Sequence, residues 1–586
     1  MNKLTHYTLV VGLAGLAGFG GSAVFNLLRP AKLVGEPFSF REWSPVAEKH
    51  AKDRVPAGIF AGDLGLAKLI AAATGKPLDQ LTYGDVEAIQ EITLDNHPLR
   101  NTNGLELLTS LQTLSANACG ITDISSLAML KNLSVLKLNS NSISSIAALK
   151  ELKNLVSVEL EENEITDLTP LANAPALQQL QVGRNRISDL TPLVGISTLS
   201  NLAVPYNRLT TVPDFGEKSK LVALDLVYNH LDIAKGSDAK TKVDAIRSKT
   251  RVRYTPQCDA LFEDGLLEVE VRKALNKPWS KLTVDDMAEL TELKLTQVPV
   301  YSLKGIGHAI NLKKLVCDET RISEIPALGS LTKLEELQLG RSRVTDLEAI
   351  RNLTQLRVLG VNELEIKDIG CLAGLKKLTA LVICRSKLAD LGFLAGLTNL
   401  VTLDVSNNLA TDSRPLATLV NMQQLNINNL KFTDYHFLGQ MNQLKFLSMS
   451  NGNLSDTSVF ANLAQLLELN INSNPITDFS GFKALGNLTR LDAQNVNFSN
   501  LSPLSYLDQL KIVDLQGNKI SDLQPLKGLH LVEKLNLEAN AITDVSPLAG
   551  LTKLDALNLK KNPLKPSTPM PVLLNHAAPL LPAGFQ

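Results

Sequence analysis

The sequence predicts an α/β solenoid of two arrays of stacked coils, with parallel strands on the concave face and short helices or irregular turns on the convex face. Three observations predict it. A 22-residue pattern, LxxLxLxxNxIxDLxPL, recurs twenty times in the 586 residues. Four positions of that pattern are apolar in every copy. The passage KPLDQLTYGDVEAIQEITL at Lys76 returns as KPWSKLTVDDMAELTELKL at Lys277, 201 residues later.

The Asn of the pattern serves as an anchor that places each coil, and every step between anchors within an array is 22 residues. The seven anchors of the first array are His97, Cys119, Asn141, Asn163, Asn185, Asn207 and Asn229. The thirteen anchors of the second array are Val298, Thr320, Ser342, Leu364, Ser386, Asn408, Leu430, Gly452, Asn474, Val496, Asn518, Asn540 and Asn562. Apolar residues stand eight, five and three positions before each anchor and two after it, so these positions should form the core.

Each LxxLxL segment should form a short strand whose leucines point inward and whose intervening residues point outward. A single coil cannot bury its leucines alone, so stability should come from contacts between neighbouring coils. An Asn side chain at the anchor can bond backbone groups of adjoining coils that would otherwise be buried without a partner. Ten of the twenty anchors are Asn.

The repeated passage predicts a helical N-terminal cap on each array, because an open solenoid end exposes apolar core and an unpaired strand edge. The first cap has four apolar residues at helical spacing: Leu66, Leu69, Ile70 and Ala73. The second has three: Leu267, Val271 and Leu275. TYGD (82–85) and TVDD (283–286) follow as capping-box signatures, each opening a second short helix. A second cap implies that the segment KVDAIRSKTRVRYTPQ has already closed the first array.

This organisation divides the chain into five parts. We expect a signal-anchor or signal peptide over 1–28, a linker over 29–58, a first repeat domain over 59–257, a second over 258–564 and a Pro-rich C-terminal cap or tail over 565–586. The first part contains an uncharged run from Tyr7 to Leu28, about the length of a membrane span. Small residues near the end of this run would also permit signal cleavage.

The pattern resembles the 22-residue leucine-rich repeats of the internalin family of bacterial surface proteins. Units such as LQQLQVGRNRISDLTPLVGI (177–196) and LKIVDLQGNKISDLQPLKGL (510–529) carry the resemblance, which covers about residues 57–586. It implies two leucine-rich-repeat arrays and a role in binding a protein partner, as internalins engage host-cell receptors. It says little about which partner this chain binds.

Composition and motifs argue against several other functions. The chain has 58 basic and 59 acidic residues, without the basic excess of a nucleic-acid binder. The five cysteines (Cys119, Cys258, Cys317, Cys371 and Cys384) show neither CxxC nor paired spacing, which argues against a disulfide framework and against zinc. The eight histidines include no pair at metal-ligand spacing, and no nucleophile, phosphate-loop or dinucleotide motif is present. We therefore expect no catalysis, no metal and no cofactor.

A series of aspartates follows successive anchors of the second array by four residues. Its members are Asp346, Asp368, Asp390, Asp412, Asp434, Asp456 and Asp478. Stacked carboxylates could bind calcium, but Asp at the start of a turn also accepts backbone N–H bonds. We expect the second role.

The residue immediately before each anchor should form a stripe along one edge of the concave face, where solenoids bind their partners. From this stripe we predict the following partner-binding residues: Glu162, Arg184, Tyr206, Tyr228, Arg341, Glu363, Arg385, Asn407, Asn429 and Asn451. The tyrosines are favoured anchors for proteins or sugars, although packing near the closing cap would also explain them. Lateral ion pairing would explain the alternating charges, and solubility would explain the amides.

A basic group precedes the second cap. It consists of Lys240, Lys242, Arg247, Lys249, Arg251 and Arg253. We expect a solvated closing edge there, with contact to anionic lipid as the alternative.

Together these features predict a non-enzymatic, extracytoplasmic binding or scaffold protein that recognises a protein partner through concave repeat surfaces. It would be anchored in the inner membrane through its N-terminal apolar segment, periplasmic, or secreted. One alternative is a carbohydrate-binding or adhesion protein of the cell envelope that uses the amide-rich second array. A cytosolic regulatory scaffold is the other.

Overall fold

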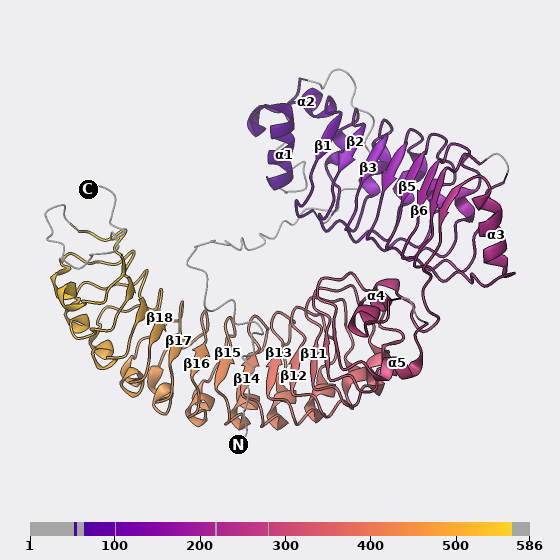
Figure 1. Ribbon diagram of the computed structural model, residues 1–586. Helices are drawn as coiled ribbons and strands as arrows, with labels where there is room; N and C mark the ends of the chain where they lie inside the picture. The colour runs from indigo at the N-terminus through magenta and orange to yellow at the C-terminus, as the bar shows by residue number, and fades with distance from the viewer. Residues whose placement is uncertain (1–51, 56–63, 100, 217–218, 279–280, 565–586) are drawn as a thin grey trace.

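The computed structural model describes residues 52–55, 64–99, 101–216, 219–278 and 281–564. Their strands form two parallel sheets, one of eight strands (β1–β8) and one of thirteen (β9–β21). In the second array the strands line the inner side of a curved solenoid, and short 3-10 helices line its outer side (Figure 1). The predicted α/β solenoid is confirmed.

All strands are three residues long and pair with their sequence neighbours. The first sheet contains β1 Glu91–Thr93, β2 Thr113–Ser115, β3 Val135–Lys137, β4 Ser157–Glu159, β5 Gln179–Gln181, β6 Asn201–Ala203, β7 Ala223–Asp225 and β8 Arg251–Arg253. The second contains β9 Glu292–Lys294, β10 Lys314–Val316, β11 Glu336–Gln338, β12 Val358–Gly360, β13 Ala380–Val382, β14 Thr402–Asp404, β15 Gln424–Asn426, β16 Phe446–Ser448, β17 Glu468–Asn470, β18 Arg490–Asp492, β19 Ile512–Asp514, β20 Lys534–Asn536 and β21 Ala556–Asn558.

The α-helices lie at the ends of the arrays. They are α1 Leu64–Thr74, α2 Tyr83–Glu87, α3 Asp238–Arg247, α4 Gly265–Ala274 and α5 Val284–Ala288. Most coils carry instead a 3-10 helix of three to five residues on the convex side, such as η5 Ser125–Met129. Short turns of this kind fit a 22-residue coil, which leaves no length for a full α-helix.

The core consists of the predicted apolar positions. Of the eighty residues that stand eight, five and three before an anchor and two after it, all are buried except Ile366, which is partly buried. The side chains form one continuous hydrophobic cluster in each array. The sheets and their cores are therefore separate, although one chain forms both.

The ten Asn anchors are buried and join adjoining coils. Asn163 is representative: its Nδ2 donates to the carbonyl oxygens of Leu138 (2.9 Å) and Leu160 (3.2 Å), and its Oδ1 accepts the N–H of Ile143 (3.0 Å). The other nine make the equivalent bonds. The predicted bonding of loop backbone by anchor amides is confirmed.

Each array begins with a helical cap. Thr82 and Thr283 form complete capping boxes at the starts of α2 and α5, as TYGD and TVDD predict. In α1 the buried face includes Leu66 and Ile70, but the expectation for Ala73 is wrong because this residue is exposed. The helix is rotated so that Ala67 faces the core instead.

The first array closes through α3 and β8. The strand β8 pairs with β7 in parallel, with Ala223 opposite Arg251 and Asp225 opposite Arg253. This step spans 28 residues instead of 22, because α3 is inserted between the two strands. The closing segment thereby adds an eighth strand to a sheet of seven repeats.

The two arrays contact each other along the loops that follow their anchors, so the first array is folded back over the beginning of the second (Figure 1). The ring of Tyr301 lies under two guanidinium groups, 4.7 Å from that of Arg208 and 5.3 Å from that of Arg186. Farther along, Arg321 donates to the carbonyl oxygens of Asn141 (2.9 Å) and Asn163 (3.3 Å).

Two further contacts strengthen this junction. Arg343 pairs with Glu164 and donates to Ser142 Oγ at 2.9 Å. Arg208 pairs with Glu263 at 3.0 Å. Because these contacts involve several coils of each array, they fix the direction in which both concave faces point.

The expected N-terminal segment (1–28), most of the expected linker (29–58) and the expected tail (565–586) lie outside the described residues. Within the described ranges, no helix has both the length and the apolar character needed to cross a bilayer. The residue limits given above for the two repeat domains stay predictions.

Candidate functional site

The residue before each anchor has a left-handed backbone in every coil. Its φ lies between 53° and 71° at all twenty positions, from Asn96 to Lys561. We call these positions the edge column, and all ten predicted partner-binding residues belong to it. Asn tolerates positive φ better than most residues, so backbone geometry alone favours Asn407, Asn429 and Asn451.

In the first array the edge column forms a continuous ladder of contacts. Ser140 donates to Glu162 at 2.6 Å, and Arg184 forms an ion pair with the other carboxylate oxygen of Glu162. The guanidinium of Arg184 lies 5.6 Å from the centre of the Tyr206 ring, which stacks on Tyr228 with centroids 4.5 Å apart. The structure thus brings the four predicted residues together, each in contact with the next.

The tyrosine pair is half-buried against the cap of the second array. A Cβ atom at Gly265, the first residue of α4, would lie 3.3 Å from Tyr206 Cδ1 and 3.3 Å from Tyr228 Cβ. Burial raises the pKa of both phenols. Stacked rings covered by a helix contribute to packing at the junction, and only part of each ring is left for a partner.

In the second array, the charged residues of the edge column form ion pairs with edge-column residues of neighbouring coils. Arg341 contacts Glu319 at 2.9 Å and Glu363 at 3.1 Å, and Arg385 contacts Glu363 at 3.4 Å. The lateral pairing considered from the sequence is confirmed. Exposed pairs of this kind contribute about 0–1 kcal/mol each.

The amides of the second array also bond one another. Asn451 donates to Asn429 at 2.6 Å, and Asn429 donates to Asn407 at 2.8 Å. Beside them, Asn426 donates to Asp404 at 3.0 Å and the oxygen of Asn428 accepts two serine hydroxyls. A ligand at this face would have to break bonds that the amides already make.

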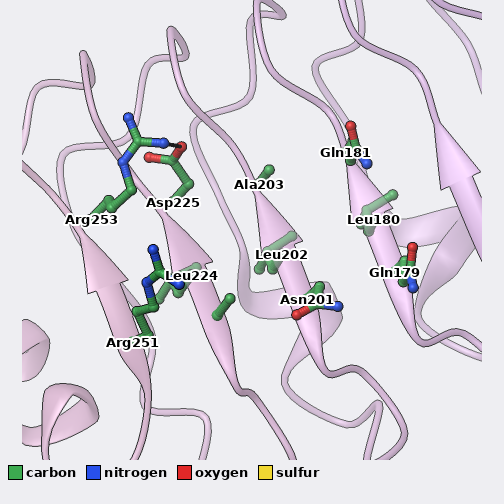
Figure 2. Close-up of a pocket in the computed structure, with 11 residues that line it drawn as sticks. Gln179, Leu180, Gln181, Asn201, Leu202, Ala203, Leu224, Asp225, Arg251 and Arg253 are labelled. Atoms are coloured by element: carbon green, nitrogen blue, oxygen red, sulfur yellow. Dashed lines mark hydrogen bonds and ion pairs between the residues drawn. The ribbon is translucent and has the colours of Figure 1, made fainter.

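A different arrangement occurs on the concave face of β5–β8, where eleven residues line an open hollow of about 320 Å³. Ala203 and Ala223 are its small lining residues. Figure 2 shows longer side chains on both sides of Ala203, with Gln181 on one side and Asp225 on the other. Gln179 and Gln181 come from β5, and the two arginines of β8 lie opposite. We call this feature the β5–β8 hollow.

Register fixes two rows of side chains across the hollow. One row runs Gln179, Asn201, Ala223, Arg251, and the other runs Gln181, Ala203, Asp225, Arg253. Arg253 and Asp225 form an ion pair at 3.0 Å. Among the described residues, no side-chain hydrogen bond or ion pair joins Gln179, Gln181, Asn201 or Arg251 to another residue.

The hollow therefore differs chemically from the edge column. The charged and amide groups predicted in the edge column bond one another. In the hollow, by contrast, one guanidinium and three amides bond no other side chain or backbone group of the described residues. Sites that bind other molecules combine a concave shape with a few polar groups available to them. The β5–β8 hollow is our candidate functional site.

The basic group before the second cap is divided between two faces. On α3, Lys240 pairs with Asp244 and Lys242 pairs with Asp238, which matches a solvated closing edge. Arg251 and Arg253 lie instead on the concave sheet. Lys249 and Arg247 are exposed.

The aspartate series has the expected capping role. Each member accepts the N–H of the residue two positions later, at 2.7–3.0 Å, and seven such bonds follow one another: Asp346, Asp368, Asp390, Asp412, Asp434, Asp456 and Asp478. Within the described ranges, no cluster of His, Cys, Asp or Glu could hold a metal ion.

The cysteines lie at separate places in the arrays. Cys119, Cys317 and Cys371 are buried, and Cys258 and Cys384 are half-buried. Burial raises the pKa of Cys371 and Cys384 to about 11. These two thiols are therefore protonated near neutral pH and are poor nucleophiles.

The hollow was missed from the sequence because β8 falls outside the 22-residue frame. The two alanines and the amides of β5 and β6 stand at regular positions of the 22-residue repeat. An alignment of the outward-facing strand positions of successive repeats therefore reveals a patch of small residues. The arginines of β8 could not be placed in the same rows, because α3 shifts the register by six residues.

The chain is similar to known leucine-rich-repeat proteins. The family model described as "Leucine Rich repeats (2 copies)" matches residues 109–151 and 310–352. An internalin (inlF) from Listeria monocytogenes is 31% identical, with a TM-score of 0.51, over 52% of this chain and 91% of the internalin. A leucine-rich-repeat protein of Leptospira interrogans is 18% identical over 83% of this chain and 93% of its own, with a TM-score of 0.30.

The mouse RP105/MD-1 complex is also similar, at 18% identity over 82% of this chain and 92% of the other, with a TM-score of 0.43. No curated protein matches the chain. The Listeria match combines a substantial identity with nearly the whole length of that protein, and the repeat model matches in both arrays. The chain therefore belongs to the internalin-type leucine-rich-repeat proteins.

Proposed function

We propose that this protein is a non-enzymatic, extracytoplasmic scaffold that recognises a protein partner through the concave face of its first array. One observation carries the proposal: the β5–β8 hollow holds free polar groups on a preformed sheet. Concave surfaces of repeat solenoids are extended binding surfaces. A rigid sheet with preplaced donors and acceptors binds with little loss of side-chain freedom, which favours affinity.

The junction between the arrays supports the scaffold role. Tyr301, Arg321 and Arg343 tie the second array to the first, so a partner held at the hollow would have a fixed position relative to the second concave face. A partner large enough to reach both faces would gain contacts without a further loss of domain freedom. The predicted edge-column residues of both arrays would then border the surface that the partner contacts.

The extracytoplasmic location is proposed from the uncharged run between Tyr7 and Leu28, which would direct the chain to or through the membrane. Fractionation of cells that produce the full chain tests it. Recovery with membranes, periplasm or medium is expected. Recovery of the full-length protein in the soluble cytosol would contradict this part of the proposal.

Site-specific photo-cross-linking in intact cells tests the binding face. A photoreactive residue at position 157, on β4 beside Gln179, borders the hollow without replacing a residue that lines it. The control carries the same group at Met129, on a convex 3-10 helix, where the side chain is 54% exposed. We expect a protein adduct from position 157 that is absent from position 129.

A third variant links the adduct to the hollow. Ala203→Trp fills the hollow and should abolish the adduct from position 157, because the partner can no longer enter. The same adducts from both positions, or an adduct that Ala203→Trp leaves unchanged, would overturn the proposal.

A further inference from the structure

We infer that the β5–β8 hollow binds an acidic side chain within an extended segment of the protein partner, with Arg251 as the residue that pairs with the carboxylate. This inference rests on the proposed function and adds the chemistry of the partner. It follows from three properties of the hollow: its length, its charge and the bonding state of its side chains.

The length of the hollow fits a short piece of extended chain. Gln179 and Arg251 stand in one row and are separated by three strand-to-strand steps. At about 4.8 Å for each step, the row spans about 14 Å. An extended chain advances about 3.3 Å per residue, so a segment of about four residues crosses the hollow. The small side chains of Ala203 and Ala223 leave room for its backbone.

The charge of the hollow favours one carboxylate. Arg251 and Arg253 contribute two positive charges and Asp225 one negative charge, but Arg253 is already paired with Asp225. The free guanidinium of Arg251 can therefore take one carboxylate, in the bidentate geometry that arginine favours. A phosphate dianion carries up to two charges and would lie near Asp225, which disfavours lipid headgroups and phosphorylated ligands.

The amides complete the match to a polypeptide. Gln179, Gln181 and Asn201 each have both a donor and an acceptor, as the backbone of an extended peptide does. None of the three side chains bonds another described residue, whereas Asn407 and Asn429 in the second array bond other amides. The acidic residue would lie at the β8 end of the segment, and its backbone neighbours would lie over β5 and β6.

Selection from a library of random linear dodecapeptides, displayed on phage, tests the inference on the purified protein. We expect the selected peptides to be enriched in Asp and Glu. Arg251→Gln should weaken their binding at least tenfold, or about 1.4 kcal/mol. Arg357→Gln is the matched control, because this arginine is exposed on the second array and makes only a loose contact with Glu335 at 3.7 Å.

The outcomes separate this inference from the proposed function. The selected peptides could bind the wild type and not Ala203→Trp, yet show no enrichment in Asp and Glu. That result would overturn the inference of an acidic partner and retain the hollow as a binding site. Binding that Ala203→Trp leaves unchanged would overturn both. Vesicles with anionic lipid that bind wild type but not Arg251→Gln would assign the hollow to phosphate groups and overturn the inference. Circular dichroism should show equal melting for Arg251→Gln and wild type, since Arg251 is exposed.

Discussion

Replacing Asn185 with alanine tests the anchor ladder, because this amide joins two adjoining coils. Its Nδ2 donates to the carbonyl oxygens of Leu160 (2.9 Å) and Val182 (3.1 Å), and its Oδ1 accepts the N–H of Ile165 at 2.9 Å. Both Leu160 and Ile165 are 0% exposed. Alanine would leave the N–H of Ile165 buried without this partner, whereas the carbonyl of Leu160 would still accept from Asn163 and that of Val182 from Asn207. A buried N–H without a partner costs about 1–3 kcal/mol, so we expect the free energy of unfolding to fall by about 1–3 kcal/mol.

Urea unfolding followed by circular dichroism measures this loss. Asn154→Ala is the matched control: its side chain also donates to a backbone carbonyl, that of Lys131 at 2.8 Å, but it is exposed. Water can replace that bond, so the control should change stability by less than about 1 kcal/mol. Repeat arrays can unfold in steps, so the comparison uses the urea midpoint of the transition in which the first array unfolds. Equal midpoints for the two variants would refute the role of the anchor amide.

Three further changes test other parts of the structure. Tyr301→Ala removes two cation–π contacts of about 1 kcal/mol each, while Arg321 and Arg343 still join the arrays. The melting temperature should fall without a change in the radius of gyration, and an unchanged melting temperature would show that these contacts do not stabilise the junction. Tyr206→Ala breaks the stack with Tyr228 and should lower the melting temperature by several degrees, and an unchanged melting temperature would show that the stack does not stabilise the junction. Burial raises the pKa of Asp264 to about 6, above its usual 3.8, so stability should fall as pH rises from about 4 to 6. In Asp264→Asn that part of the pH dependence should vanish, and an identical profile in both proteins would refute it.

The core and the caps could be predicted because they depend on periodicity. A strand points alternate side chains to one face, and a fixed repeat brings the same face inward in every coil. The capping boxes at Thr82 and Thr283 follow from local chemistry that four residues contain. Such features need no knowledge of distant contacts.

The candidate site and the junction could not be predicted in the same way. The left-handed backbone of the edge column leaves only a weak signal in the sequence, the frequent Asn, and an Asn-rich column is also what a polar binding surface would show. The hollow depends on Arg251, whose register is set by an inserted helix. The junction depends on charged surface residues such as Arg321 and Arg343, which follow no apolar pattern and meet residues about 180 positions away.

Hydrogen exchange with and without the cross-linked partner, once it is purified, tests the central claim most directly. Peptides that cover β5 and β6 (179–203) and β8 (251–253) should exchange more slowly in the complex, because the partner would cover the hollow. The amide ladder around Asn407, Asn429 and Asn451 should change less. Slower exchange confined to that ladder or to the convex 3-10 helices, with β5–β8 unchanged, would contradict the account.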